Sequence, residues 1–311
     1  SLDDLIALTH SRLNDMMKLG TTTAELKTGY GLSAEAESKQ MQAILTVAEE
    51  HPMTLVPTYL GAHTKPPEYD TTAEYLQTIF DESLPRAQEA YARSATAQKN
   101  IPLFVDIFVE KGVFSVEDMI AYFEFAREQG IPLKAHLDQF ENMGGVPIAV
   151  KMGAVSVDHL EVTPPEELEI IATSDTVGVM LPTVNFNLGL MKFGNARHLI
   201  DRGGILALAT DYNPGSSPTI SLILVMAIAC GYQKLLPAEA LNACTINAAV
   251  ALKVADRVGS LEAGKQADLV VLDTPDYRGM MVEFGRNFVE QVYIKGSANG
   301  RDHLRRCEPE L

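Results

Sequence analysis

Residues 102–135 read PLFVDIFVEKGVFSVEDMIAYFEFAREQGIPLKA, and this stretch shows the strand–helix–strand pattern that indicates the fold class of the chain. Apolar runs of strand character at 102–108 and 132–135 flank a helical stretch that begins at Ser115 and ends at Gly130. Ser115 is a good helix N-cap, because its hydroxyl accepts a hydrogen bond from an otherwise unpaired backbone N–H. Short strands rich in Val, Ile and Leu that alternate with helices are typical of βαβ units, which build a parallel sheet.

The same alternation extends from near the N-terminus to about residue 255. Strands are predicted at 22–26, 54–60, 102–108, 132–135, 154–157, 177–181 and 205–209. Helices are predicted at 4–19, 33–50, 72–94, 115–130, 145–152, 164–174, 196–202 and 219–231. These seven strands are one fewer than a (β/α)8 barrel needs. An open doubly wound sheet is the alternative, but no GxGxxG follows any strand, which removes the commonest cofactor use of that fold.

The sequence pattern changes after Gly231. Residues 237–255 read as one or two helices, and strands are expected within 259–273 and at 288–295. We therefore expect a barrel over residues 1–255 and a small C-terminal β appendage with a tail over residues 256–311. The polar end of the chain, 296–311, is expected to be loosely held.

Composition narrows the classes of partner and compartment. The 311 residues include 25 basic and 41 acidic side chains, a net charge of −16 that disfavours nucleic acid and anionic membrane surfaces as partners. The longest apolar run, 220–230, is too short for a membrane span, which needs about 20 residues. It either packs into the barrel or forms part of a homodimer interface. Three cysteines without a CxxC pair indicate the reducing cytoplasm.

Polar residues are concentrated at the ends of the predicted strands. In a parallel α/β barrel the catalytic groups lie at the carboxyl ends of the strands. The residues in such positions are Glu25, Lys27, Tyr30, His63, Asp106, Glu110, His136, Asp138, Gln139, Asp158, His159, Asn185, Asn187, Asp211 and Asn213. Three of these are histidines, and neutral imidazole together with carboxylate is a ligand set for zinc or iron. A bound ion of this kind acidifies a water molecule enough to supply hydroxide near neutral pH.

Asp211 is the strongest single candidate. It follows a mostly apolar run in residues 205–214, ILALATDYNP, and a carboxylate at the end of a buried strand is costly unless a cation accompanies it. Asp211 could ligate a metal, accept the proton of an attacking water, or cap the following helix. Residues 213–217 offer donors for a substrate carboxylate, or form an ordinary Pro-Gly turn.

Several segments together carry a family resemblance. They are ELKTGYGL at 25–32, YLGAH at 59–63 with Pro67, AHLDQ at 135–139, DHL at 158–160, ATDYNPGSSP at 209–218 and GSLEAGKQAD at 259–268. With them the chain resembles the imidazolonepropionases of the amidohydrolase superfamily over nearly its whole length. The resemblance implies a (β/α)8 barrel with one divalent metal ion, zinc or iron. It also implies hydrolysis of the cyclic amide C–N bond of 4-imidazolone-5-propanoate to N-formimino-L-glutamate, a small-molecule reaction of histidine degradation.

The resemblance also implies roles for individual residues. His136 and Asp211 would be metal ligands, and the catalytic group would be Asp211, His159 and Gln139. His159 would lie beside the metal and polarise the scissile carbonyl or move the proton. Some members carry Glu at the position of Gln139, so the amide here is expected to bind the ring, not to act as a base. The remaining substrate-binding residues would be Tyr30 and His63 for the ring and its propionate arm, and Asn213, Gly215 and Ser216 for the carboxylate.

One departure from the family pattern concerns the beginning of the chain. The family starts with half of a β-sandwich and a first barrel strand ending in His-x-His, and an arginine near the substrate carboxylate belongs to the same part. No His-x-His occurs in this sequence. We therefore expect a fragment or a truncated form in which the first barrel strand is absent. The alternatives are another amidohydrolase, such as a prolidase-like or different cyclic-amide hydrolase, and a non-catalytic barrel remnant.

Overall fold

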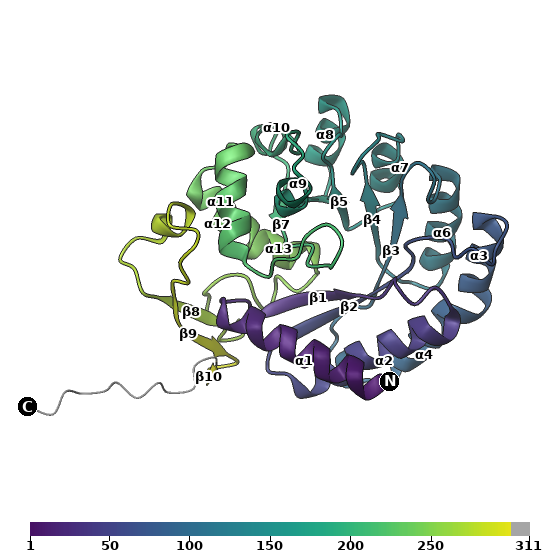
Figure 1. Cartoon of the computed structure of the whole chain (residues 1–311), viewed down its shortest axis with the longest axis horizontal. Helices are drawn as coiled ribbons and strands as arrows, with labels where there is room; N and C mark the ends of the chain where they lie inside the picture. Colours follow the sequence, from purple (N-terminus) through teal and green to yellow (C-terminus); the bar gives the residue numbers. More distant parts are fainter. Residues whose placement is uncertain (300–311) are drawn as a thin grey trace, which may run out of the picture.

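The structure, a computed structural model, describes residues 1–299, and its main feature is a curled sheet of seven parallel strands (Figure 1). The strands follow one another in chain order across the sheet. They are β1 (Thr23–Lys27), β2 (Thr54–Ala62), β3 (Phe104–Val109), β4 (Leu133–Leu137), β5 (Ser156–His159), β6 (Val177–Met180) and β7 (Leu206–Leu208). The seven predicted strands are therefore confirmed, each shifted by no more than a few residues.

Helices surround the curled sheet and connect its strands (Figure 1). Before β3 they are α1 (Leu2–Lys18), α2 (Ala34–Glu50), α3 (Thr72–Thr78), η1 (Ile79–Ser83), α4 (Leu84–Ala92) and α5 (Ala95–Gln98). Between β3 and β7 they are α6 (Val116–Glu128), α7 (Val146–Lys151), α8 (Pro165–Ala172), α9 (Pro182–Leu188) and α10 (Ala196–Asp201). After β7 follow α11 (Leu222–Tyr232), α12 (Pro237–Ala243), α13 (Ile246–Ala251) and the 3-10 helix η2 (Tyr277–Met281).

The single helix predicted over residues 72–94 is in fact interrupted. Its middle turn, η1, is a π-helix, in which the N–H of Leu84 donates to the carbonyl of Ile79. Pro85 follows directly and has no N–H to donate to the carbonyl of Asp81, so the regular i→i−4 ladder cannot continue there. The prediction of helix was right for this segment, but the prediction of one continuous helix was wrong.

The strand register brings the chemistry-bearing positions together. His136 on β4 pairs with Asp158 on β5, and Leu137 pairs with His159. On the other side of β4, Asp106 of β3 pairs with Lys134. Within residues 1–299, β1 and β7 form the two edges of the sheet and do not pair with each other. Seven parallel strands in chain order, curled into an open sheet, are the barrel architecture expected from the sequence.

A second, smaller sheet follows the barrel strands. It is antiparallel and consists of β8 (Leu269–Leu272), β9 (Val289–Ile294) and β10 (Ser297–Asn299). Its apolar residues pack against α1, α2 and β2 in one cluster, whose buried members are Leu13, Met17, Val47, Met53, Leu55, Val289, Val292 and Ile294. The predicted C-terminal β appendage is confirmed, while its division from the barrel at residue 255 stays a prediction. Part of the expected loose tail is strand β10, and the rest, 300–311, lies outside the described residues.

The apolar run at 220–230 forms most of α11. Its residues Ile223, Val225, Met226 and Ala229 are buried in the main core, so this helix packs into the barrel. No helix among the described residues is long and apolar enough to cross a membrane.

Candidate active site

The carboxyl ends of the strands carry strained backbone at the residues predicted to be functional. Asp138, His159 and Leu160 have φ of 59°, 86° and 68°, and Asp211 has φ of 48°. Non-glycine residues rarely adopt this left-handed region, and each costs on the order of 1–3 kcal/mol. Such strain is typical of active sites, where the surrounding structure holds a side chain in a position that the strand alone would not give it.

His136 on β4 lies at the centre of the polar residues. Its Nδ1–H donates to Oδ1 of Asp106 on β3 at 3.1 Å, and both side chains are buried. The ring of His159 lies 5.1 Å from the ring of His136, centroid to centroid. Because Nδ1 is engaged by Asp106, Nε2 is the nitrogen of His136 that remains for a ligand.

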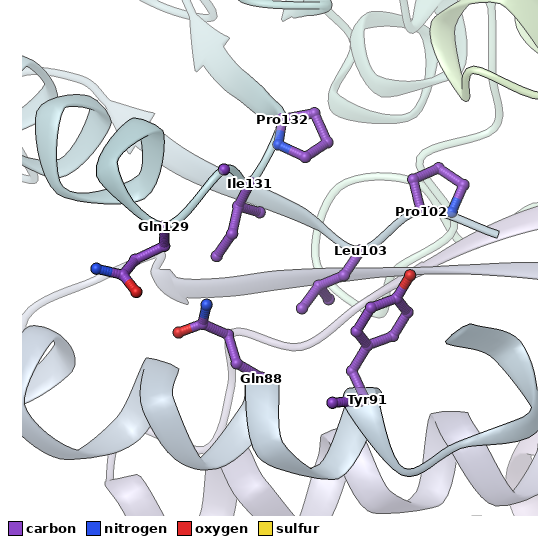
Figure 2. Close-up of a pocket in the computed structure, with 9 residues that line it drawn as sticks. Gln88, Tyr91, Pro102, Leu103, Gln129, Ile131 and Pro132 are labelled. Atoms are coloured by element: carbon purple, nitrogen blue, oxygen red, sulfur yellow. The ribbon is translucent and has the colours of Figure 1, made fainter. Parts of the chain in front are cut away.

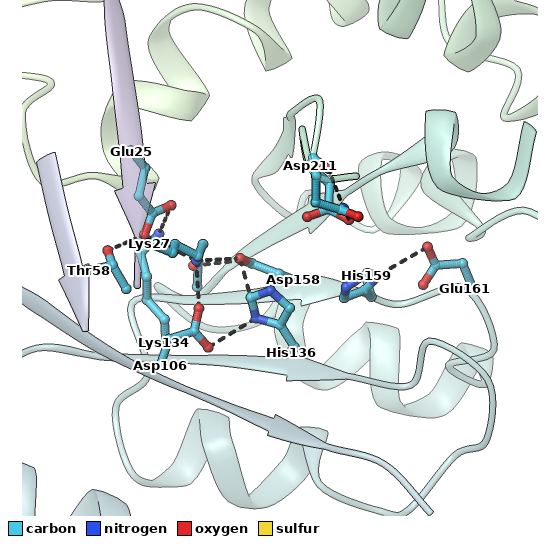
Figure 3. Close-up of polar contacts among 12 residues, drawn as sticks. Glu25, Lys27, Thr58, Asp106, Lys134, His136, Asp158, His159, Glu161 and Asp211 are labelled. Atoms are coloured by element: carbon cyan, nitrogen blue, oxygen red, sulfur yellow. Dashed lines mark hydrogen bonds and ion pairs between the residues drawn. The ribbon is translucent and has the colours of Figure 1, made fainter. Parts of the chain in front are cut away.

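A network of charged side chains, each buried or half-buried, surrounds Asp106 (Figure 3). The ammonium nitrogen of Lys27 lies 2.6 Å from Asp106, 3.1 Å from Asp158 and 3.2 Å from Glu25. Lys134 donates to the other oxygen of Glu25 at 3.0 Å. Two ammonium groups thus face three carboxylates, so with neutral histidines the network keeps one unmatched negative charge. Burial of Lys27 opposes its charge, yet Asp106 and Asp158 raise its pKa well above the usual value.

The charge of this network fits a bound cation. Asp106, His136 and Asp158 are the single set of three potential ligands in residues 1–299 whose donor atoms lie within 4.8 Å of one another. Burial opposes ionisation of Asp106, but His136 and Lys27 lower the pKa of its carboxyl. Imidazole and carboxylate together are a set that zinc and iron accept. Asp106 and Asp158 already contact Lys27, so the free Nε2 of His136, next to this negative network, is the atom that fits a divalent metal ion.

Asp211 follows β7 and lies in a turn that is stabilised by hydrogen bonds among residues 211–216. Asn213 donates from Nδ2 to Oδ2 of Asp211 at 3.1 Å. The Oδ1 of Asn213 accepts from the backbone N–H groups of Gly215 and Ser216 at 2.8 and 2.7 Å. Asp211 is outside the set of three around His136, and its predicted role as a metal ligand stays a prediction. Asn213, Gly215 and Ser216 lie together in this turn, and their predicted role in binding a substrate carboxylate stays a prediction.

Tyr30 and His63 form an aromatic pair. Their ring centroids are 4.8 Å apart, and His63 also stacks on Phe108 at 5.7 Å. Burial and then the proximity of His136 lower the pKa of His63 to about 4, so its imidazole is neutral at pH 7. The Nδ1 of His63 is buried without a hydrogen-bond partner among the described residues. Burial and the Asp211 carboxylate raise the pKa of the Tyr30 hydroxyl.

His159 ends β5 and pairs with a residue that the sequence did not single out. Its Nδ1–H donates to Oε1 of Glu161 at 3.3 Å, and both side chains are buried. Burial opposes the imidazolium form, but the Glu161 carboxylate outweighs it and raises the pKa of His159 to about 9. Figure 3 shows His159 between His136 and Glu161.

Gln139 was predicted to be functional, whereas Lys134 was not. Gln139 is half-buried and makes no side-chain hydrogen bond to any residue in 1–299, so its predicted contact with substrate stays a prediction. Lys134, like Glu161, was missed by the sequence reasoning. Lys134 lies two positions before His136 on β4, and side chains two apart in a strand share a face, so strand alternation could have identified it.

One cavity lies apart from this site (Figure 2). It has a volume of about 410 Å³ and lies between α4 and the segments that precede β3 and β4. Its lining includes Gln88, Tyr91, Leu103 and Gln129 and contains no charged side chain. It therefore lies at the amino ends of the strands, where barrels carry stabilising residues and not catalytic ones.

Comparison with known proteins agrees with the fold. A model of the amidohydrolase family matches residues 21–298, so the class of protein that the barrel and its strand-end site define is an amidohydrolase. An imidazolonepropionase of Chloroflexus aggregans is 48% identical over 294 residues, which cover 94% of this chain and 69% of the relative. One from Herpetosiphon aurantiacus is 46% identical over 302 residues, 97% of this chain and 70% of the relative. The chain belongs to the imidazolonepropionases.

Solved structures with a similar fold are more distant in sequence. An adenosine deaminase from Xanthomonas campestris with bound zinc superposes with a TM-score of 0.73 at 19% identity, covering 96% of this chain and 70% of the other. A mutant atrazine chlorohydrolase from Arthrobacter aurescens, solved with zinc and atraton, gives a TM-score of 0.75 at 17% identity, with coverages of 98% and 74%. These similarities concern the barrel fold alone.

Proposed function

We propose that this strand-end site hydrolyses the cyclic amide C–N bond of 4-imidazolone-5-propanoate and yields N-formimino-L-glutamate. As an imidazolonepropionase the chain is a hydrolase that acts on C–N bonds. The observation that carries the substrate assignment is the 46–48% identity over nearly the whole chain to two proteins of that name. The site supports it, because neutral His63, His159 and the Asp211 turn all lie at the carboxyl ends of the barrel strands.

One divalent ion, zinc or iron, is proposed to be held by His136 and Asp211. When bound, this ion supplies an acidified water and polarises the ring carbonyl. The unmatched negative charge around Asp106 supports a cation next to His136, and the 3.1 Å contact to Asp106 holds the His136 ring with Nε2 free. Carboxylates commonly orient a metal-bound histidine in this way.

The protein residues divide the proton transfers between them. Asp211, oriented by Asn213, accepts the proton of the attacking water. His159 donates a hydrogen bond from Nε2 to the oxygen that gains negative charge as the ring carbonyl becomes tetrahedral. The ring nitrogen is then protonated and leaves. Gln139 carries no acidic or basic group and is proposed to bind the ring.

Substrate binding is proposed to use the aromatic pair and the turn after β7. Tyr30 and His63 lie 4.8 Å apart and offer flat faces and polar atoms for a small planar anion. Asn213, Gly215 and Ser216 are proposed to bind the substrate carboxylate, for which the N–H groups of Gly215 and Ser216 would turn from Oδ1 of Asn213 to the substrate. We further propose that the enzyme works in the cytoplasm, and that any homodimer forms through a surface other than the buried face of α11.

The test is a paired measurement on Asp211→Asn in the full-length enzyme. We expect the ring-opening rate to fall at least 100-fold and the metal content to fall with it, because Asn neither accepts the water proton nor carries the charge of a ligand. Wild-type rates and metal content in this variant would contradict the role of Asp211. Binding of imidazole-4-acetic acid should raise the melting temperature of the wild-type enzyme, and stabilisation by a dipeptide instead would favour a peptidase.

A further inference from the structure

Glu161 is a buried residue whose carboxylate oxygens accept very few hydrogen bonds. Among residues 1–299, its Oε1 accepts one hydrogen bond, from Nδ1 of His159, and its Oε2 has no hydrogen-bond partner. A buried carboxylate that lacks partners costs free energy. By contrast, the buried carboxylate of Glu110 accepts hydrogen bonds from the backbone N–H groups of Lys111, Phe140 and Glu141, and so has an evident structural task. Glu161 has no such task.

The backbone is strained in a way that brings Glu161 to His159. Glu161 lies two residues after His159, beyond the last residue of β5, so the alternation of the strand no longer sets the direction of its side chain. Here His159 and Leu160 both have left-handed φ, 86° and 68°, so the chain turns back immediately after β5. This turn places the carboxylate 3.3 Å from Nδ1.

The surrounding structure is built to hold this turn. Leu160 is fully buried, and two glycines leave room for it. A Cβ added to Gly178 on β6 would lie 3.1 Å from Cδ1 of Leu160, and one added to Gly194 would lie 3.0 Å from the Leu160 carbonyl oxygen. The strain is therefore maintained by close packing on two sides, as is typical where a side chain is held for function.

We propose that Glu161 is a positioning residue for His159 in the hydrolysis, a proposal that rests on the proposed function. The two nitrogens of an imidazole point to different sides of the ring. With Nδ1–H held by Glu161, Nε2 is directed away from Glu161, toward the side on which the ring of His136 lies 5.1 Å away (Figure 3). Glu161 thereby presents one defined nitrogen of His159 to the substrate carbonyl without touching the substrate itself.

The first test measures steady-state kinetics of Glu161→Gln and Glu161→Ala in the metal-loaded, full-length enzyme. Removal of a carboxylate that orients a metal-binding histidine typically costs about 10–100-fold in activity, and we expect an effect of similar size for His159. We expect kcat of Glu161→Ala to fall in that range while KM stays within about twofold, because the binding residues are untouched. Glu161→Gln keeps an oxygen acceptor for Nδ1–H and should retain an intermediate kcat. A loss confined to KM, or equal kcat in all three proteins, would overturn the proposal.

A matched control pair exists on the surface. Glu169 lies 3.4 Å from Nε2 of His198, between α8 and α10 and outside the site. Glu169→Gln removes a Glu–His ion pair, together with the contact of the same oxygen to Arg202, and should leave kcat and KM unchanged. A similar loss of kcat in this variant would show that the effect of Glu161 is not specific to the site.

The second test does not depend on turnover. With ¹⁵N-labelled histidine, the Nδ1 and Nε2 resonances of His159 should shift in Glu161→Ala, because the ring loses the partner that holds its Nδ1 proton. Unchanged His159 resonances would contradict the proposal even in an inactive protein. If the wild-type enzyme fails to open the ring while these resonances shift, the proposed function is wrong and the positioning of His159 stands.

Discussion

A single ammonium group, that of Lys27, links three strands of the barrel. Lys27 lies on β1, and its charge contacts Asp106 on β3 and Asp158 on β5 at 2.6 and 3.1 Å. Both carboxylates are buried, so neither has water to replace this partner. In such a place the loss of one charge leaves the others desolvated and unpaired.

Lys27→Met should therefore be strongly destabilising. The expected loss in the free energy of unfolding is about 3–5 kcal/mol, the typical cost of removing one partner from a buried ion pair. Urea denaturation followed by circular dichroism measures it. Lys18→Met is the control: Lys18 pairs with Asp15 on the exposed surface of α1, and its loss should change stability by no more than about 1 kcal/mol. Equal effects of the two substitutions would contradict the role of Lys27.

His51 provides a pH-dependent contribution to stability, remote from the active site. Burial, followed by the nearby His10 and Lys295, lowers the pKa of His51 to about 4, against 6.5 for the unperturbed group. The folded protein thus favours the neutral ring. The contribution of the neutral His51 ring to the free energy of unfolding is fully present above pH 6.5. It is lost as the pH falls toward 4, because His51 takes up its proton at a higher pH in the unfolded chain than in the folded protein.

The measurement compares the wild-type protein with His51→Gln between pH 7.5 and 4. The wild-type protein should lose more unfolding free energy over this range than the variant does. Parallel curves for the two proteins would mean that His51 does not titrate in the way its surroundings indicate.

At the scale of elements, the segment between β1 and α2 shows how a helix positions a substrate-binding loop. Glu37, in the first turns of α2, accepts backbone hydrogen bonds from Gly29, Gly31 and Leu32. Tyr30 lies between two of these residues and packs on His63. Gly31 also lies tightly against α2: a Cβ there would be 2.6 Å from the backbone N of Glu37. The loop can keep its position only with glycine at residue 31.

Gly31→Ala should accordingly move this loop. We expect a loss of about 1–3 kcal/mol in unfolding free energy from overpacking, and a rise in KM as Tyr30 leaves its place. Thermal denaturation and steady-state kinetics measure the two effects. Gly231→Ala, in α11, is the matched control because an added Cβ meets nothing within 4 Å, and alanine there should be neutral or stabilise the helix slightly. An unchanged KM in Gly31→Ala would refute the proposed role of the loop.

At the scale of the whole molecule, the small C-terminal sheet and the N-terminal helix share one apolar cluster. Val292 and Ile294 of β9 pack with Leu13 and Met17 of α1 and with Leu55 of β2. The two ends of the described chain are thus joined through the same core (Figure 1). The shared cluster favours cooperative unfolding of barrel and appendage over two independent transitions.

Ile294→Ala tests this cooperativity. Ile294 is 1% exposed, and truncating a buried side chain of this size costs about 2–5 kcal/mol. We expect one calorimetric transition in both the wild-type protein and the variant, shifted to lower temperature in the variant. Val271→Ala, on the exposed side of the same sheet, should shift it far less, since Val271 is 38% exposed. A second transition that moves alone would instead indicate an independent C-terminal domain.

The sequence predicted what depends on short-range patterns. Strand alternation and strand ends located His136, Asp158 and His159, and the local TDYNPG segment located Asp211 with Asn213. It did not predict contacts between distant segments, such as Lys134 with Glu25 or the choice of Asp106 as partner of His136. The sequence pattern did not predict the position of Glu161 either. That position depends on the left-handed backbone of His159 and Leu160, which is maintained by the packing of Leu160 against Gly178 and Gly194. The two-residue alternation of a strand predicts the direction of a side chain within the strand, but not in the turn that follows it.

The unequal number of positive and negative groups around Lys27 has a consequence for the stability of the folded chain. Lys27 and Lys134 offset two of the three negative charges, so a cation that neutralised the third would stabilise the folded chain relative to the unfolded one. The melting temperature of the metal-depleted protein should accordingly rise when a divalent ion is added back, by an amount that grows with the ion's concentration.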